Sequence, residues 1–495
     1  SARARAAVAA GVAALVVAAC TTPGPASEPT DAASAGRGPA GPSTASDPAG
    51  PSSPSDSPGP STTRSPAAGP GQDARPDDRG TADPVTEPLA IAVHHTSPLR
   101  EVSLPRARRI VAGASDLDVV AGPPRAAVRE VARDPGAVAV VPARVLGPEL
   151  RAVSVAGVDP VRRPGAYPLR TGADEEPGPV VSVTVVGDIM LGRGVAEAAR
   201  GSDHPAPALM PTAARISRAD VAVGNLENTL SRAGPPTQGG DSFAADPAVS
   251  GALREAGFDV LGLANNHAGD FGDRALVRTV RRLRAAGLET FGAGATPRRA
   301  WAPAVVERQG VRFGFLGFNA IGETPTVAPG QPGAVSVGMP PRTGPLDRAA
   351  LSRFERAVRR LDRRVDVVVV LPHWGTQYTN RPEPVQRTVA RRLVRAGADV
   401  VVGGHPHWLQ GVELVRGRLV VHSLGNFVFD MDFMRETQEG AILEMTFWGG
   451  ELKAADFVPY VMDERYAPRV VAGVRGAEVL EVMRATSGPA HRSRR

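Results

Sequence analysis

Histidine, aspartate and asparagine side chains stand directly after apolar runs in the second half of the chain, where they could hold a metal ion. His405 and His407 lie two residues apart in the turn "GGHPH", and His373 follows the run "VVVVLP". Asp188 ends the run "VSVTVVG" in the same way. Carboxylate, carboxamide and neutral imidazole groups that converge on one point are ligands for divalent cations. The pattern therefore predicts a metal site.

Further strand ends carry the same kinds of polar side chain. The segments "GNLEN", "ANNHAGD" and "HSLGN" each follow an apolar run, and five of the nine histidines fall at such positions. A single aspartate or histidine at a strand end is commonly a structural polar group, whereas an ordered set of this size points to chemistry. Glycines before these residues let the backbone crowd a shared cavity.

Residues 181 to about 475 alternate short apolar runs with amphipathic segments, which predicts a mostly parallel α/β sheet. Ligands of such sheets gather outside the carboxyl ends of the strands, so the polar side chains should meet there. The later runs "AILEMTFWG" and "ELKAADFVPYVM" predict an antiparallel hairpin and with it a second sheet. Strands are expected at 181–186, 221–224, 260–263, 312–318, 367–371, 400–402 and 419–422, and helices near 248–256, 273–286, 347–362 and 384–396.

The ordered motifs "GDIMLGR", "NLE", "NNHAGDFG", "PHWG", "GGHPH" and "SLGNF" resemble those of the CapA-type poly-γ-glutamate capsule synthesis proteins. These proteins are relatives of the calcineurin-like metallophosphoesterases, and the resemblance spans roughly 182–430. It implies an α/β fold for residues 181–475, a four-layer αββα sandwich with a dinuclear metal site at the strand ends. It also implies a role in making an anionic envelope polymer.

The resemblance assigns roles to individual residues. Glu227, or with less support Asn225, would stand where the superfamily has its bridging aspartate. His267 would be the general acid that protonates a leaving oxygen, with Asp270 beside it in the catalytic group. Arg193 would clamp a phosphate, although it could equally be a surface arginine. The metal ligands implied in this way are Asp188, Glu227, Asn266, His373, His405 and His407.

Such a centre would hydrolyse a phosphoester, because two cations lower the pKa of a bridging water and neutralise charge on a phosphoryl oxygen. The expected ions are Mn, Mg, Zn or Fe. Met190 stands where the superfamily's first motif has a histidine, and a thioether is a poor ligand for these ions. The site is therefore expected to hold one or two ions.

The N-terminal segment predicts export and anchoring. Two arginines and an apolar run from Ala6 to Ala19 are typical of a signal peptide, and "VAAC" resembles a bacterial lipobox ending at Cys20. The alternative to a lipoprotein is an ordinary signal peptide, or a short anchor, with an incidental cysteine. Residues 1–20 are thus interpreted as a lipoprotein signal peptide, with Cys20 lipidated on the extracytoplasmic face of the membrane. Residues 21–85, rich in Pro, Ser, Ala and Gly, predict a disordered tether, and 476–495 a disordered tail.

Residues 86–172 predict a small α/β module that precedes the larger domain. The runs "LAIAV", "LDVVAG" and "AVAVVPARVL" predict strands, and "PRAAVREVARD" predicts a helix. The later part of this segment resembles one lobe of phosphate-type substrate-binding proteins. A ligand-binding lipoprotein is therefore a third interpretation. His94 and His95 are interpreted as structural rather than metal-binding.

Composition excludes several classes of protein. Lys453 is the only lysine, and its surroundings do not form a phosphate-binding loop, which argues against an ATP-driven ligase. The single cysteine excludes an internal disulfide. The net charge of +6 comes from arginines spread over helices, with no nucleic-acid-reading motif. Two functions remain: a surface-anchored hydrolase acting on a phosphoester or polymer-linked bond, and a non-catalytic accessory protein that binds an anionic polymer and supports a capsule synthetase complex.

Overall fold

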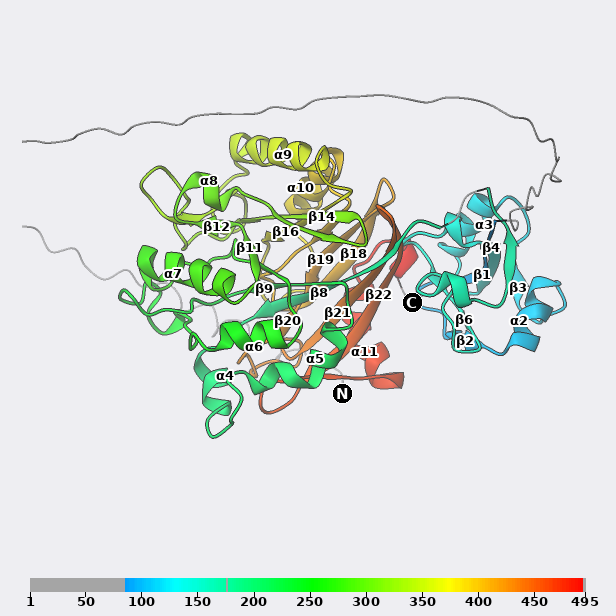
Figure 1. The fold of residues 1–495 in the computed structure, drawn as a ribbon, viewed down its shortest axis with the longest axis horizontal. Coiled ribbons are helices and arrows are strands. Elements are labelled where there is room, and N and C mark those ends of the chain that lie inside the picture. The colour runs from blue at the N-terminus through cyan, green and yellow to red at the C-terminus, as the bar shows by residue number, and fades with distance from the viewer. Residues whose placement is uncertain (1–84, 175–176, 493–495) are drawn as a thin grey trace, which may run out of the picture. The chain divides into compact units, whose positions relative to one another are not determined.

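The computed structural model describes residues 85–174 and 177–492 (Figure 1). The expected signal peptide, Cys20 and the tether up to residue 84 lie outside this range. The last three residues of the expected tail lie outside it as well. None of the helices in the described part of the chain is long and apolar enough to cross a membrane.

The small module is a sheet with a helix on each face. Side chains on one face of β1, such as Ala90 and Ala92, pack with α3, and those on the other face, Ile91 and Val93, pack with α2. This division follows from the alternation of side chains along a strand. The elements are β1 (Thr86–Val93), β2 (Glu101–Val102), α2 (Leu104–Val111), β3 (Asp118–Val119), α3 (Pro124–Val131), β4 (Ala137–Pro142), β5 (Arg151–Ala152), β6 (Ser154–Val155) and β7 (Arg170–Gly172).

The larger domain begins with a mixed sheet of order β11-β10-β9-β8-β21-β22-β23. The strands β8 to β11 are parallel, and β21 pairs antiparallel with β8. The β21–β22 hairpin was expected to start a second sheet, and that expectation is wrong, because β21 extends the first sheet. The strands are β8 (Val180–Ile189), β9 (Val221–Leu226), β10 (Val260–Gly262), β11 (Glu289–Phe291), β21 (Glu439–Trp448), β22 (Glu451–Met462) and β23 (Pro468–Val470).

A second sheet, of order β13-β14-β16-β17-β19-β18, lies against the first. The strands β14, β16, β17 and β19 are parallel, so their carboxyl ends share one edge. The strands are β13 (Ala304–Arg308), β14 (Val311–Asn319), β16 (Val367–His373), β17 (Val400–Val402), β18 (Leu409–Val415) and β19 (Arg418–Leu424).

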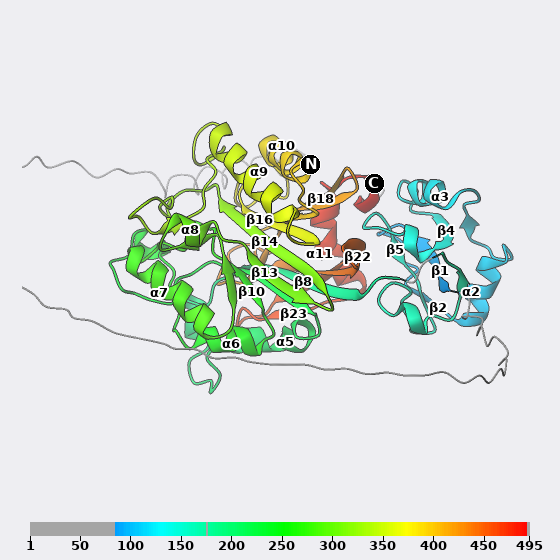
Figure 2. The ribbon, with the colours of Figure 1, turned by 45° about the horizontal axis from the view of Figure 1, so that its top comes forward.

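Helices cover the outer face of each sheet and complete a four-layer αββα sandwich (Figures 1 and 2). One core lies between the sheets and contains Val183, Val223, Val369 and Val400. A second core joins the first sheet to α5–α7, and a third joins the second sheet to α9 and α10. The helices are α4 (Arg193–Ala198), α5 (Met210–Ile216), α6 (Val249–Glu255), α7 (Gly272–Ala285), α8 (Pro297–Ala300), α9 (Arg348–Asp362) and α10 (Pro384–Arg395).

The described part of the C-terminal segment contains two helices, so the prediction of a disordered tail from residue 476 is wrong for these residues. Helix α11 (Gly473–Arg484) buries Val479, Leu480 and Met483 in the core between the sheets. A short 3-10 helix, Pro489–His491, follows it. Burial of these three apolar side chains offsets the entropy of ordering the helix.

Replacing Met483 with alanine should lower the free energy of unfolding by about 2–5 kcal/mol, because it opens a cavity in a packed core. Val474 lies on the same helix but is 79% exposed, and Val474→Ala should change stability by no more than about 0.5 kcal/mol. Urea denaturation of the two variants measures the difference. Equal stability of Met483→Ala and the wild type would contradict the packing of α11.

Candidate metal centre

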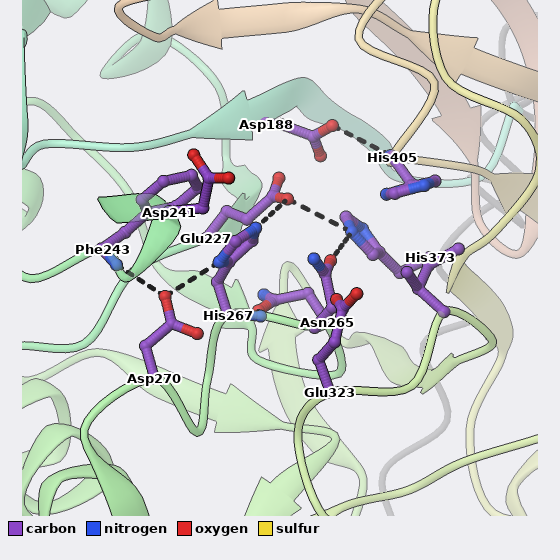
Figure 3. A network of polar contacts seen from close by, with 12 residues as sticks. Asp188, Glu227, Asp241, Phe243, Asn265, His267, Asp270, Glu323, His373 and His405 are labelled. Carbon is purple, nitrogen blue, oxygen red and sulfur yellow. Dashed lines mark hydrogen bonds and ion pairs between the residues drawn. The ribbon is translucent and has the colours of Figure 1, made fainter. Parts of the chain in front are cut away.

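The polar strand-end side chains meet at the carboxyl edge of both sheets (Figure 3). Asp188 lies at the end of β8, and His373 is the last residue of β16. Glu227 directly follows β9, and the turn after β17 carries His405 and His407. All five side chains are buried. The sequence therefore brings together residues from distant parts of the chain, because parallel strands place their carboxyl ends at the same edge.

These side chains form two groups with the spacing of metal ligands. Glu227, His373 and His405 have candidate ligand atoms within 4.8 Å of one another, and so do Asp188, Glu227 and His407. Glu227 belongs to both groups. Buried carboxylate and imidazole groups at this spacing are suitable ligands for a divalent cation.

Unpaired buried atoms support the fit to a cation. Both ring nitrogens of His405 are buried without a hydrogen-bond partner among the described residues. Glu227 Oε1 also has no hydrogen bond there, although it lies 3.3 Å from His373 Nε2. A buried polar atom without a partner costs about 1–3 kcal/mol. A bound cation would remove that cost, since imidazole nitrogens and carboxylate oxygens are both ligands for divalent metals.

The turn that carries the two histidines has an unusual backbone. His405 has φ +94° and His407 has φ +60°, a region that residues other than glycine seldom occupy. The backbone N–H of His405 donates to Asp188 Oδ2 at 2.9 Å, which fixes the turn against the end of β8. A Cβ on Gly404 would lie 2.6 Å from Asp188 Oδ1, so a larger residue there would displace the Asp188 carboxylate. Such backbone conformations cluster at functional sites.

Asn225 donates hydrogen bonds into the centre. Its Nδ2 lies 2.8 Å from Asp188 Oδ1, and its Oδ1 accepts a hydrogen bond from Asn265 Nδ2 at 2.9 Å. This pairing assigns the amide orientation and leaves the oxygen turned away from the ligand groups. Glu227, and not Asn225, therefore belongs to the groups of possible ligands. Asn266 presents its Oδ1 at 2.9 Å from His373 Nε2, among the other candidate ligands.

His267 and Asp270 form a hydrogen-bonded pair beside the candidate ligands. His267 Nδ1 lies 2.8 Å from Asp270 Oδ2, and His267 Nε2 lies 3.9 Å from Glu227 Oε1. Asp270 Oδ2 also accepts from the backbone N–H of Phe243 at 2.6 Å, and the Phe243 ring stacks on His267 at 3.8 Å. The aspartate therefore fixes the imidazole with Nε2 facing the centre, the orientation that a proton donor needs.

Arg193 lies near this pair, but a carboxylate already holds its side chain. Its guanidinium is over the Phe243 ring, 4.2 Å from the centroid, and contacts Asp430 through Nη2 at 2.6 Å and Nε at 3.1 Å. Asp241 lies 3.4 Å from Nη1. Arg193 is therefore close to the site, and a phosphate would have to compete with Asp430 for it.

Met190 is part of the hydrophobic core between the first sheet and its helices, where it is fully buried. Its sulfur accepts a hydrogen bond from the backbone N–H of Gly192 at 3.1 Å. The side chain is therefore used for packing.

Burial shifts the pKa values of the site in the direction that favours uncharged side chains. It raises the pKa of Asp188 to about 7, with Glu227 as a second cause, and that of Glu227 to about 8. It lowers the pKa of His373 to about 4 and of His407 to about 3, and that of His405 well below its usual value. The imidazoles are thus neutral and ready to bind a metal, whereas the two carboxyl groups hold protons that a cation must displace.

Metal affinity should therefore rise with pH. Below a pH of about 7 both carboxyl groups are protonated in the metal-free protein, and each displaced proton makes affinity up to about tenfold stronger per pH unit. The rise should end above a pH of about 8, where both groups are ionised. Titration calorimetry with Mn²⁺ in buffers of different ionisation enthalpy measures both affinity and proton release. An affinity independent of pH would contradict carboxylate ligation.

Several contributors were not singled out from the sequence. Gln238 donates to Asp270 Oδ1 at 2.5 Å, and Phe243 stacks on His267, but both lie in a loop without a periodic pattern. Asn265 orients Asn225 and accepts from the backbone N–H of His267 at 3.1 Å. Glu323 lies beside the centre in Figure 3 and contributes to the raised pKa of Glu227. Glu323 follows β14. A search for polar residues just after each predicted strand, which we call the strand-end rule, could therefore have found it.

Comparison with known proteins agrees with the motif order. Residues 182–431, about half of the chain, match the family profile described as "Bacterial capsule synthesis protein PGA_cap". The chain is 32% identical over 291 residues to "Capsule biosynthesis protein CapA" of Bacillus anthracis, covering 57% of this chain and 68% of that protein. It is 32% identical to "PGA biosynthesis protein CapA" of Bacillus subtilis (strain 168), covering 54% and 67%.

Among solved structures, a hypothetical protein from Thermus thermophilus matches with a TM-score of 0.37 and 18% identity, covering 57% of this chain and 99% of that one. The family match covers Asp188, Glu227, His373, His405 and His407. The chain therefore belongs to the family of bacterial capsule synthesis proteins.

Proposed function

We propose that this chain is an extracytoplasmic capsule synthesis protein whose divalent-metal centre hydrolyses a phosphoester or a polymer-linked bond of the cell envelope. The observation that supports this proposal best is the shared position of Glu227 in two ligand groups, with the His267–Asp270 pair alongside. The relatives' names, which refer to capsule and PGA biosynthesis, support the polymer context.

Different residues would bind the cations and transfer the proton during hydrolysis. Asp188, Glu227, Asn266, His373, His405 and His407 would hold the cations. Bound cations supply a water of lowered pKa and neutralise charge on the phosphoryl oxygens. His267 would give the proton on Nε2 to the leaving oxygen, and Asp270 would keep the ring in place through Nδ1. The products are then an alcohol and a phosphate or its remaining ester.

A non-catalytic accessory role is the second candidate. Two positions favour it: Met190 is packed in the core, and Asn225 points its amide N–H groups at Asp188. Both positions depart from the superfamily's pattern of metal ligands, and an incomplete set could bind a cation without turnover. In that case the same cleft would bind an anionic polymer and pass it to a synthetase complex.

Metal content and hydrolysis, measured together on the full chain, separate these candidates. The purified protein is expected to contain Mn, Mg, Zn or Fe and to hydrolyse a generic aryl phosphate. Protein that binds polyglutamate and metal but hydrolyses no phosphoester would favour the accessory role. Protein that takes up no divalent metal would refute the metal centre itself.

The N-terminal segment is proposed to anchor this domain to the membrane. Lipidation of Cys20 would hold the folded part at the extracytoplasmic face, close to a capsule synthetase complex. Partition of the wild type and a Cys20→Ser variant between detergent and water phases tests the anchor. The wild type should enter the detergent phase and the variant should not.

A further inference from the structure

Two adjoining hollows lie between the small module and the second sheet of the larger domain, away from the metal centre. Their volumes are about 640 Å³ and 680 Å³, and they share Arg129, Glu149 and Gly417. α3 lines one side, and the turn that joins β18 to β19 lines the other together with residues 488–491 in one hollow and 450–452 in the other. None of the candidate metal ligands lines either hollow. The hollows form a continuous groove, which we call the module groove.

A row of three exposed arginines runs along the module groove. Arg125 lines one hollow, Arg129 lines both and Arg133 lines the other. Arg125 and Arg129 are four residues apart and lie on the same face of α3, about 6 Å apart along its axis, and Arg133 follows in the turn after the helix. The opposite face of α3 is buried through Ala127, Val128 and Val131, which fixes the row toward the groove.

The charge along the groove is not balanced. Three of its acidic residues are paired: Asp399 with Arg418, Glu413 with Arg387 and Glu451 with Lys453. In contrast, no ion pair or hydrogen bond to the side chains of Arg125, Arg129, Arg133 and Arg416 occurs within the described residues. Only Glu149 stands against these four guanidinium groups. The groove therefore has a surplus of positive charge.

The two walls of the groove are held together by a common core. Trp448 and Ala454 of the larger domain pack among Ala90, Ala92 and other apolar residues of the module. The Trp448 Nε1–H donates to the carbonyl of Val161 at 2.8 Å, and the rings of His95 and His491 stack at 4.1 Å. Because both walls share buried contacts, the groove is preformed, and binding there needs little ordering of the protein.

We propose that the module groove binds a chain of repeating carboxylates, of which polyglutamate is an example, and that the α3 arginines are its main contacts. A row of guanidinium groups at regular spacing fits a ligand with regularly spaced negative charges better than a single small anion. Guanidinium also pairs with carboxylate through two parallel hydrogen bonds. The choice of a carboxylate polymer rests on the proposed function, whereas the groove itself does not. The module would thus hold the polymer that the metal centre or a partner acts on.

A triple substitution of the row tests the proposal on the full chain. Arg125→Gln, Arg129→Gln and Arg133→Gln together should weaken binding of a fluorescently labelled polyglutamate oligomer at least about tenfold at low salt, measured by anisotropy. The matched control replaces three exposed arginines of α9, Arg348, Arg356 and Arg359, with glutamine. That control removes the same charge and should change binding by less than about twofold.

Other outcomes are equally decisive. Equal weakening in the α9 control would mean that overall charge rather than the groove binds the polymer, and undiminished binding in the α3 variant would also overturn the proposal. Tighter binding of single-stranded DNA than of polyglutamate through the same arginines would refute the carboxylate assignment. A triple arginine-to-lysine variant of the same three positions is the control for misfolding. It should have the wild-type melting temperature and bind the oligomer in part. The variant His405→Ala/His407→Ala should keep polymer binding, so a failed metal centre and a failed groove give different results.

Discussion

Replacing His405 and His407 together with alanine is expected to remove bound divalent metal from the protein. Each histidine belongs to a different ligand group, and Glu227 is common to both. Loss of a residue that only supports a ligand lowers metal affinity about 10- to 100-fold. Loss of a direct ligand should lower it further. Inductively coupled plasma mass spectrometry after dialysis against a fixed Mn²⁺ concentration measures the loss.

The single variants report the number of ions. With two cations, His405→Ala should lose the ion near His373, and His407→Ala the ion near Asp188, so each keeps about one equivalent. With one cation, either substitution should remove nearly all the metal. The control is His204→Ala. His204 lies outside the site and pairs with Glu255. Full metal content in the double variant would exclude both histidines as ligands.

The strand-end rule worked because burial and direction are both encoded locally. An uninterrupted run such as Val367–Leu371 fits a strand covered on both faces, and the next polar residue, His373, ends that strand at the carboxyl edge of the sheet. The same reasoning places Asp188 at the end of β8. The sequence therefore determines which edge carries the site.

The choice between neighbouring residues could not be made in that way. Asn225 and Glu227 are two positions apart, so a strand pattern places both on the same side. A hydrogen bond from Asn265, forty positions away, orients the Asn225 amide, and Glu227 is the residue that belongs to both ligand groups. The contact is tertiary, and nothing in the local sequence specifies it.

The same limit explains the two errors in the fold. Pairing of β21 with β8 joins segments more than 250 residues apart, and a hairpin pattern does not say which strand it extends. The helix α11 is stabilised by the core that receives Val479 and Met483. Its own residues include two glycines, which weaken a helix taken in isolation.

Replacing His267 with alanine is expected to leave metal content unchanged and to slow hydrolysis about 10²- to 10⁴-fold, because general acid catalysis supplies that range. Asp270→Asn should have a smaller effect, since it keeps a hydrogen-bonding group near Nδ1 but removes the charge that stabilises a protonated ring. Steady-state kinetics of both metal-loaded variants measure the rates.

The leaving group provides the sharper test of this role. A nitrophenolate departs readily without a proton, so His267→Ala should slow nitrophenyl phosphate hydrolysis much less than alkyl phosphate hydrolysis. A substitution that merely disturbed the site would slow hydrolysis of both substrates alike.

Arg193→Gln is the companion variant, because Arg193 stacks on Phe243 and lies outside both ligand groups. It should show no preference for either leaving group, and equal sensitivity of His267→Ala to the two substrates would remove His267 from proton transfer.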